Sequence, residues 1–179
     1  MDHIKNLKIV ITAGASGIGS EIAHTLSRAG AKVIICDKDQ TALDQFSKEN
    51  SEVISLKADI SDESEVLSLF DEIKNHFGEI NALINNAGIA GPSAKLEDTN
   101  FDDWQNTLSV NLNGTFLCSK SAIPLLKSAG GGSIINIGST SSFMGTPLRS
   151  SYSATKWGLI GLTKTWAMEY GEDLSLIHI

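Results

Sequence analysis

The sequence has few cysteines, few prolines and no clustered cysteine or histidine motif. Cys36 and Cys118 are its only cysteines, and neither has a CxxC or Cys/His spacing around it. A small disulfide-linked scaffold and a zinc site are therefore not expected. We expect two buried thiols in a reducing cytosol and no bound metal.

Positive charge and long apolar runs are also scarce. Fourteen Lys and Arg residues stand against 21 Asp and Glu residues, which gives a formal net charge of −7. This balance argues against a broad basic face, so nucleic acid is not an expected partner. The longest uncharged stretch, residues 128–148, is rich in Gly, Ser and Thr, so we expect no membrane span. The first residues lack the pattern of a secretory signal, and we expect a cytoplasmic protein.

Short runs of Ile, Val and Leu alternate along the chain with longer segments of helical period. Such alternation implies right-handed βαβ crossovers and an α/β fold with a doubly wound parallel sheet, the Rossmann fold. The expected strands are residues 7–11, 32–36, 53–56, 82–84 and 133–137, and the expected helices are residues 18–29, 41–49, 63–77, 104–127 and 151–170.

A glycine-rich turn, residues 12–19, joins the first expected strand to the first expected helix. Glycines let the backbone turn tightly and let a pyrophosphate approach the helix N-terminus, where free N–H groups and the helix dipole favour negative charge. The residues expected to contact a dinucleotide here are Gly14, Ser16, Gly17, Ile18 and Gly19.

An acidic residue ends the second expected strand. Asp37 lies 18 positions beyond Gly19, where a carboxylate can accept hydrogen bonds from the adenosine ribose and repel a 2′-phosphate. This position favours NAD, although the neighbouring Lys38 leaves NADP open. The alternative is that Asp37 is only a solvated turn residue at a strand end.

The spacing Thr-x-x-x-x-Gly-x-Gly of the turn resembles the TGxxxGxG motif of the short-chain dehydrogenase/reductase family, with Ala13 at the first glycine position. Four further features resemble the same family and follow in its order. They are Asp59-Ile60 after the third strand, Asn85-Asn86-Ala87-Gly88 after the fourth, Asn111 in the long helix, and Ser139 thirteen residues before the Tyr152-x-x-x-Lys156 pair.

The resemblance implies an NAD(P)-dependent oxidoreductase that interconverts a secondary alcohol and a ketone by hydride transfer. A small-molecule alcohol or carbonyl compound is then the expected partner. The implied catalytic residues are Asn111, Ser139, Tyr152 and Lys156. The implied cofactor contacts, beyond those of the glycine-rich turn and Asp37, are Asp59, Ile60, Asn86, Ala87, Gly88, Tyr152 and Lys156.

Tyr and Lys four residues apart lie on one face of a helix. A nearby ammonium favours a phenolate, so Tyr152 could exchange a proton with the substrate oxygen. The resemblance further implies that Lys156 holds the nicotinamide ribose and that Ser139 donates a hydrogen bond to the substrate oxygen. It also implies that Asn111 binds a water that links Lys156 to solvent.

Each assignment has an alternative. A Tyr/Lys pair occurs on many amphipathic helices, Ser139 has three neighbouring hydroxyl residues at positions 140–142, and Asn111 could simply bond to backbone inside a helix. The whole chain could be a non-catalytic nucleotide-binding regulator or fragment. An epimerase or dehydratase of the extended branch of the fold is disfavoured by the turn spacing and by residues 86–88.

Two features concern packing and the end of the chain. Gly158 and Gly161 on the last helix suggest close packing, and the resemblance implies a homodimer or homotetramer at full length. Residues 174–179 match a translation of a transposon-end sequencing adapter and do not resemble the family. We therefore expect an incomplete single domain, residues 1–173, with a non-native tail, and the alternative is a natural C-terminus. The fifth strand would then be an exposed edge, and the chain alone poorly soluble and nearly inactive.

Overall fold

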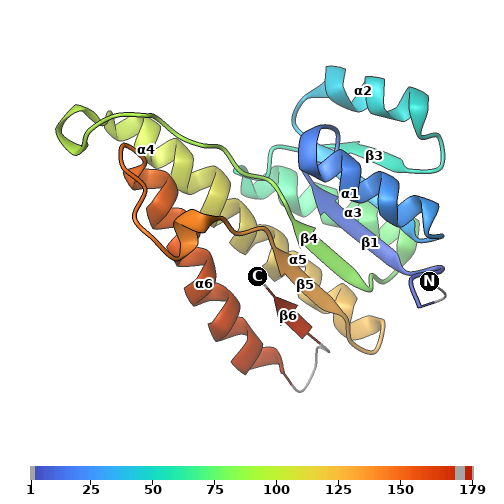
Figure 1. The fold of residues 1–179 in the computed structure, drawn as a ribbon. Coiled ribbons are helices and arrows are strands. Elements are labelled where there is room, and N and C mark those ends of the chain that lie inside the picture. Colours follow the sequence, from blue (N-terminus) through green and yellow to red (C-terminus); the bar gives the residue numbers. More distant parts are fainter. Residues whose placement is uncertain (1–2, 172–175, 179) are drawn as a thin grey trace.

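The structure, a computed structural model, describes residues 3–171 and 176–178 and contains a six-stranded parallel sheet (Figure 1). The strand order is β3-β2-β1-β4-β5-β6, and every neighbouring pair is parallel. This order confirms the expected doubly wound sheet. The strands are β1 (Lys8–Thr12), β2 (Lys32–Asp37), β3 (Ile54–Lys57), β4 (Ala82–Asn85), β5 (Ser133–Asn136) and β6 (Leu176–His178).

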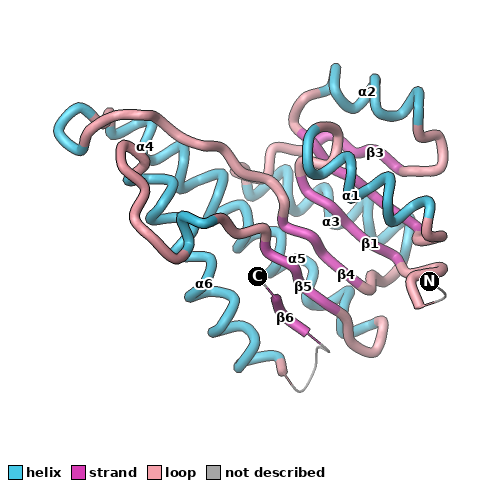
Figure 2. The backbone as a smooth tube through the Cα atoms, viewed as in Figure 1, coloured by secondary structure: helices cyan, strands magenta, loops and turns pink. Residues whose placement is uncertain are grey.

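Helices connect the strands (Figure 2), and the long expected helix before β5 contains three successive elements. A π-helical turn, η2 (Ser109–Asn113), separates its two halves, and Asn111 lies in that turn. Wide turns of this kind occur often at functional sites. The helices are α1 (Gly17–Arg28), α2 (Gln40–Glu49), α3 (Glu63–Phe77), α4 (Phe101–Leu108), α5 (Gly114–Ser128) and α6 (Ser150–Tyr170), with short 3-10 turns η1 (Leu96–Asp98) and η3 (Thr140–Ser142).

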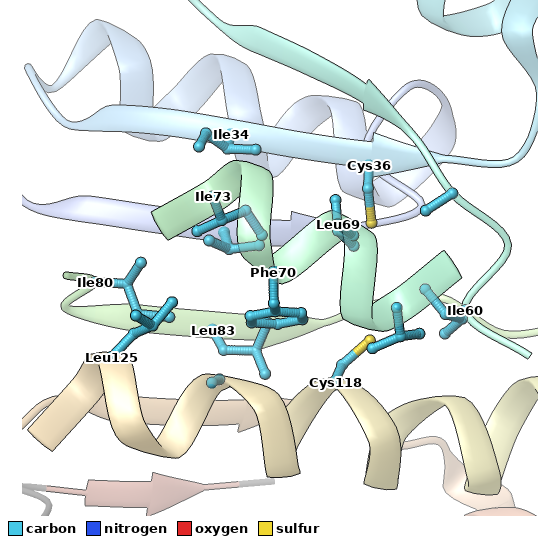
Figure 3. Packing of buried hydrophobic residues seen from close by; sticks show 14 of the residues in the cluster. Ile34, Cys36, Ile60, Leu69, Phe70, Ile73, Ile80, Leu83, Cys118 and Leu125 are labelled. Atoms are coloured by element: carbon cyan, nitrogen blue, oxygen red, sulfur yellow. The ribbon is translucent and has the colours of Figure 1, made fainter. Parts of the chain in front are cut away.

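Side chains alternate between the two faces of each strand and build one apolar cluster on each face. On the α3 and α5 face, Ile34 and Leu83 pack with Phe70 and other residues of those helices (Figure 3). On the other face, a second cluster joins the sheet to α1 and α2. Cys36 and Cys118 are both buried thiols of the first cluster, as expected.

The expectation that β5 forms the edge of the sheet is wrong. Residues 176–178 form β6, which pairs in parallel with β5 from Ser133 to Ile135. The three residues of β6 supply β5 with the backbone hydrogen-bond partners that an edge strand lacks. The expected tail therefore contributes a strand, while its residues 174, 175 and 179 and the expected domain boundary at 173 lie outside the described residues.

The two glycines of α6 do not both mark close packing. A Cβ at Gly158 would lie 3.0 Å from Leu112 Cδ1 of the same chain, whereas one at Gly161 would meet nothing within 4 Å. The contact at Gly158 is therefore made inside the chain, and a homo-oligomer stays a prediction. None of the helices in the described ranges has the length and apolar character needed to cross a membrane.

Candidate active site and cofactor pocket

The glycine-rich turn, residues 12–19, packs closely against its surroundings at two of its glycines. A Cβ at Gly14 would lie 2.5 Å from Ile35 Cβ, and one at Gly19 would collide with the carbonyl oxygen of Ala13. Ala13 has a φ of 49°, in the left-handed region that favours glycine. The residue that departs from the family motif thus adopts the backbone conformation of a glycine.

The N-terminus of α1 is open. Its N-cap residue, Ser16, makes no side-chain capping hydrogen bond, and a Cβ at Gly17 would meet nothing within 4 Å. Ile18, next to it, is 66% exposed. Uncapped N–H groups at an accessible helix N-terminus suit an anionic phosphate group, so the residues of this turn fit a pyrophosphate.

Asn86 holds this turn from the neighbouring strand. Its Nδ2 donates to the carbonyl oxygens of Thr12 and Ala13, both at 3.0 Å. In return, Thr12 Oγ1 accepts hydrogen bonds from the backbone amides of Asn86 and Ala87 at 3.1 and 3.0 Å. Asn86 and Thr12 therefore fix the turn to the end of β4, and Thr12 was not among the predicted contact residues.

A cavity of about 90 Å³ opens beside the turn, at the carboxyl ends of the central strands. It brings together five of the predicted cofactor residues with five others. The lining residues are Asp37, Asp59, Ile60, Ala87 and Gly88, together with Ala13, Lys38, Ala58, Ile89 and Val110. Ligands of open α/β sheets bind at this kind of crevice.

The two carboxylates of the cavity have different partners. Asp37 accepts hydrogen bonds from the amides of Ala15 at 3.3 Å and Asp39 at 3.1 Å. Asp59 accepts from the amide and hydroxyl of Ser61 at 3.0 and 2.7 Å, and Lys38 Nζ lies 4.0 Å from it. Partial burial opposes ionisation of Asp59, but the Ser61 hydrogen bonds and the Lys38 charge prevail and lower its pKa.

The predicted reactive pair lies on α6 as the spacing requires. Lys156 Nζ is 5.7 Å from the centre of the Tyr152 ring, and it donates a 2.7 Å hydrogen bond to the carbonyl oxygen of Ile137, just beyond β5. Lys156 is only 5% exposed. Burial lowers the pKa of Lys156, because the ammonium is less well solvated there than in water.

Ser139 begins the η3 turn. Its Oγ accepts a hydrogen bond from the Ser141 amide at 3.2 Å, which leaves the hydroxyl able to donate. The neighbouring hydroxyls are engaged differently: Ser141 Oγ lies 2.6 Å from Thr146 Oγ1, and Ser142 Oγ is fully buried and accepts from the Ser139 amide. Among these three serines, the geometry favours Ser139 as the substrate contact.

The side chain of Asn111 is bound to the protein. Its Oδ1 accepts from the Ile89 amide at 2.7 Å, and its Nδ2 donates to the Ile89 carbonyl at 2.9 Å and to Thr155 Oγ1 at 3.1 Å. The side-chain amide of Asn111 therefore bonds to backbone, which is the alternative that the sequence left open. Gly88 lies beside both Asn111 and Lys156, since a Cβ there would lie 3.4 Å from Asn111 Oδ1 and 3.8 Å from Lys156 Nζ.

Thr155 and Ile89 were missed by the sequence analysis. Thr155 Oγ1 donates to the Tyr152 carbonyl at 2.8 Å while it accepts from Asn111. Ile89 takes part through its backbone, which leaves no signal in the residue type. In the described part of the chain, no group of three His, Cys, Asp or Glu side chains is placed to hold a metal ion.

Comparison with known proteins agrees with this geometry. The chain is 40% identical to an uncharacterised oxidoreductase, YxbG, of Bacillus subtilis (strain 168), over 97% of this chain and 64% of that protein. It is 37% identical to D-beta-hydroxybutyrate dehydrogenase of Rhizobium meliloti (strain 1021), over 92% of this chain and 66% of that protein. The chain thus spans about two thirds of the length of these relatives.

A solved structure of NAD+-bound xylitol dehydrogenase superposes with a TM-score of 0.91 and 26% identity, over 98% of this chain and 68% of that one. The family model described as short chain dehydrogenase matches residues 7–178. The chain belongs to the short-chain dehydrogenase family of oxidoreductases.

Proposed function

We propose that the protein interconverts a secondary alcohol and a ketone with a nicotinamide cofactor, and that Tyr152 transfers the proton. The observation that carries this proposal is the pairing of Tyr152 with the buried ammonium of Lys156, 5.7 Å from its ring. Ser139, with a hydroxyl able to donate, begins the turn that precedes the same helix.

The residues present fit a dinucleotide. Asp37 would accept the adenosine ribose hydroxyls, and the amides at the N-terminus of α1 would hold the pyrophosphate. NAD is favoured over NADP. Lys38 lies 4.0 Å from Asp59, which partly balances its charge, so Lys38 attracts the 2′-phosphate of NADP less strongly. When bound, the nicotinamide supplies or accepts the hydride.

The chain's own residues account for the proton. During alcohol oxidation, Tyr152 as phenolate removes the hydroxyl proton of the substrate while the carbon loses a hydride, and the reverse occurs in carbonyl reduction. Lys156 favours the phenolate by its charge. Ser139 donates a hydrogen bond to the substrate oxygen, on which charge changes during the reaction.

The test uses a purified chain of the relatives' full length, and it follows the reduction of NAD+ and NADP+ with a panel of secondary alcohols by the absorbance of the reduced nicotinamide. We expect turnover with NAD+, and the variant Asp37→Ala should lower the preference for NAD+ over NADP+ by about tenfold, the loss of one good hydrogen-bonded carboxylate contact. Tight cofactor binding without turnover of any alcohol or ketone would favour the non-catalytic alternative.

A second proposal concerns the 179 residues alone. Because they span about two thirds of the curated relatives, we propose that they bind the cofactor and turn over little substrate. All ten residues that line the cavity proposed to bind the cofactor belong to the described part of the chain. Calorimetric titration with NADH beside an activity assay separates binding from turnover, and full dehydrogenase activity would contradict the proposal.

A further inference from the structure

The segment that follows β4, residues 88–91, passes between the π-helical turn and the start of α6. Its first residue, Gly88, lies against both Asn111 and Lys156. The next residue, Ile89, has its amide and its carbonyl bound by the one side chain of Asn111, at 2.7 and 2.9 Å. The path of this backbone therefore determines where the Asn111 amide sits relative to Lys156.

Gly91 fixes the far end of the segment. Its φ is 65°, and a Cβ there would lie 2.6 Å from Thr107 Oγ1 and 2.9 Å from Ser151 Oγ. A side chain at this position is excluded both by the left-handed backbone and by the close contact with α4 and α6. The segment thus touches the first turn of α6, the helix that carries Tyr152.

Arg149 completes this contact from the N-terminal end of α6, three residues before Tyr152. Its Nη1 donates to two successive carbonyl oxygens, those of Ala90 at 3.2 Å and Gly91 at 2.9 Å. Hydrogen bonds from a guanidinium are stronger than those between neutral groups. Although Arg149 is the N-cap residue, its side chain caps nothing in its own helix and reaches across to the segment.

No acidic side chain competes for this guanidinium among the residues that the structure describes. The three ion pairs found there are all made by lysines, Lys8, Lys38 and Lys120. The carbonyl oxygens of residues 90 and 91 are therefore the partners that hold the Arg149 side chain in place.

We propose that Arg149 is a positioning residue, which ties residues 89–91 to the first turn of α6 and so holds Asn111 and Gly88 against Lys156. The inference rests on the proposed function, in which Lys156 acts with Tyr152. Arg149 itself touches none of the reacting atoms. It acts through the backbone of Ala90 and Gly91, and then through Ile89 and Asn111.

The test compares Arg149→Gln and Arg149→Lys with Arg28→Gln, which removes the chain's only other arginine. Arg28 is exposed at the end of α1, far along the chain from this contact. Hydrogen exchange is measured at the amide of Ile89, which donates to Asn111 Oδ1. We expect exchange about tenfold faster in Arg149→Gln, an intermediate rate in Arg149→Lys, and the wild-type rate in Arg28→Gln, because a lost charge-assisted hydrogen bond is worth at least a factor of ten.

Activity provides the second measurement. The Arg149→Gln variant should lose kcat about equally on neutral alcohols and on hydroxy carboxylates, with little change in the affinity for NAD+. A loss confined to hydroxy carboxylates, with unchanged exchange at the Ile89 amide, would show that Arg149 binds a substrate carboxylate and would overturn the proposal. Unchanged exchange in both Arg149 variants would overturn it as well.

The two arms separate this inference from the proposed function. Hydrogen exchange is measured on the free protein and needs no turnover. If the wild-type protein showed no turnover but Arg149→Gln still exchanged faster, the Arg149 contact would be supported and the proposed function would fail. If Arg149→Gln does not fold, the exchange rate of Arg149→Lys relative to wild type decides, and a wild-type rate there would count against the proposal.

Discussion

The cofactor half of the molecule, β1 to β3 with the glycine-rich turn, holds its charges differently from the reactive half, β4 to β6 with α4 to α6. Asp59 is partly exposed and surrounded by donors, which lower its pKa and favour its charged form. Lys156 is buried, and burial lowers its pKa and disfavours its charged form. The surroundings thus stabilise the charge of Asp59, where the cofactor is expected, and disfavour the charge of Lys156, where the reaction is expected.

The largest expected effect lies in the reactive half, at the buried Asn111. Asn111→Ala should lower the free energy of unfolding by about 3 kcal/mol, because it leaves the amide and carbonyl of Ile89 without their partner. Denaturation with urea measures this loss. The neighbouring, exposed Asn113 provides the control, and Asn113→Ala should change the stability by less than about 0.5 kcal/mol. Equal losses in the two variants would show that the Asn111 hydrogen bonds to Ile89 do not stabilise the reactive half.

A smaller gain is expected in the cofactor half, at Ala13. Its φ of 49° costs an alanine roughly 1 kcal/mol that a glycine does not lose, so Ala13→Gly should stabilise the protein by up to about that amount. Ala15→Gly, at a buried residue without a left-handed backbone, should instead destabilise it. Thermal unfolding of both variants provides the comparison, and a lower Tm for Ala13→Gly would contradict the reading of this turn.

The smallest effects concern pH, and the two halves should respond in different ranges. Asp59 has a lowered folded pKa, so its contribution is present above the unfolded value of 3.8 and is lost as the pH falls through the folded pKa. The variant Asp59→Asn should therefore reduce the loss of stability in acid.

Lys156 should act in the alkaline range. Its folded pKa is lowered from 10.5, so between the folded pKa and 10.5 the unfolded chain binds more protons than the folded one. Stability from this group should rise with pH across that window, and Lys156→Met should remove the rise. Denaturation at a series of pH values measures both variants. An alkaline slope that persists in Lys156→Met would assign it to another group.

The sequence predicted the sheet, and it named five of the ten residues that line the cavity, because those features have local signals. Strands and helices follow from hydrophobic period, and the turn from glycine spacing. The contacts of Asn86 with Thr12 and of Arg149 with Gly91 join residues 74 and 58 positions apart and use backbone carbonyls. Such acceptors occur at every residue, so no residue type marks them. The π-helical turn and the strand β6 likewise depend on tertiary contacts.

Tyr152→Phe tests the central claim most directly, because it removes one oxygen and leaves the ring over Lys156. The account predicts that the variant loses at most about tenfold in affinity for NADH, the cost of one hydrogen bond, and loses about a thousandfold in kcat for alcohol oxidation, the scale of general acid–base catalysis. Single-turnover measurements beside NADH titration provide both values. A Tyr152→Phe variant that keeps its kcat would contradict the assignment of proton transfer to Tyr152.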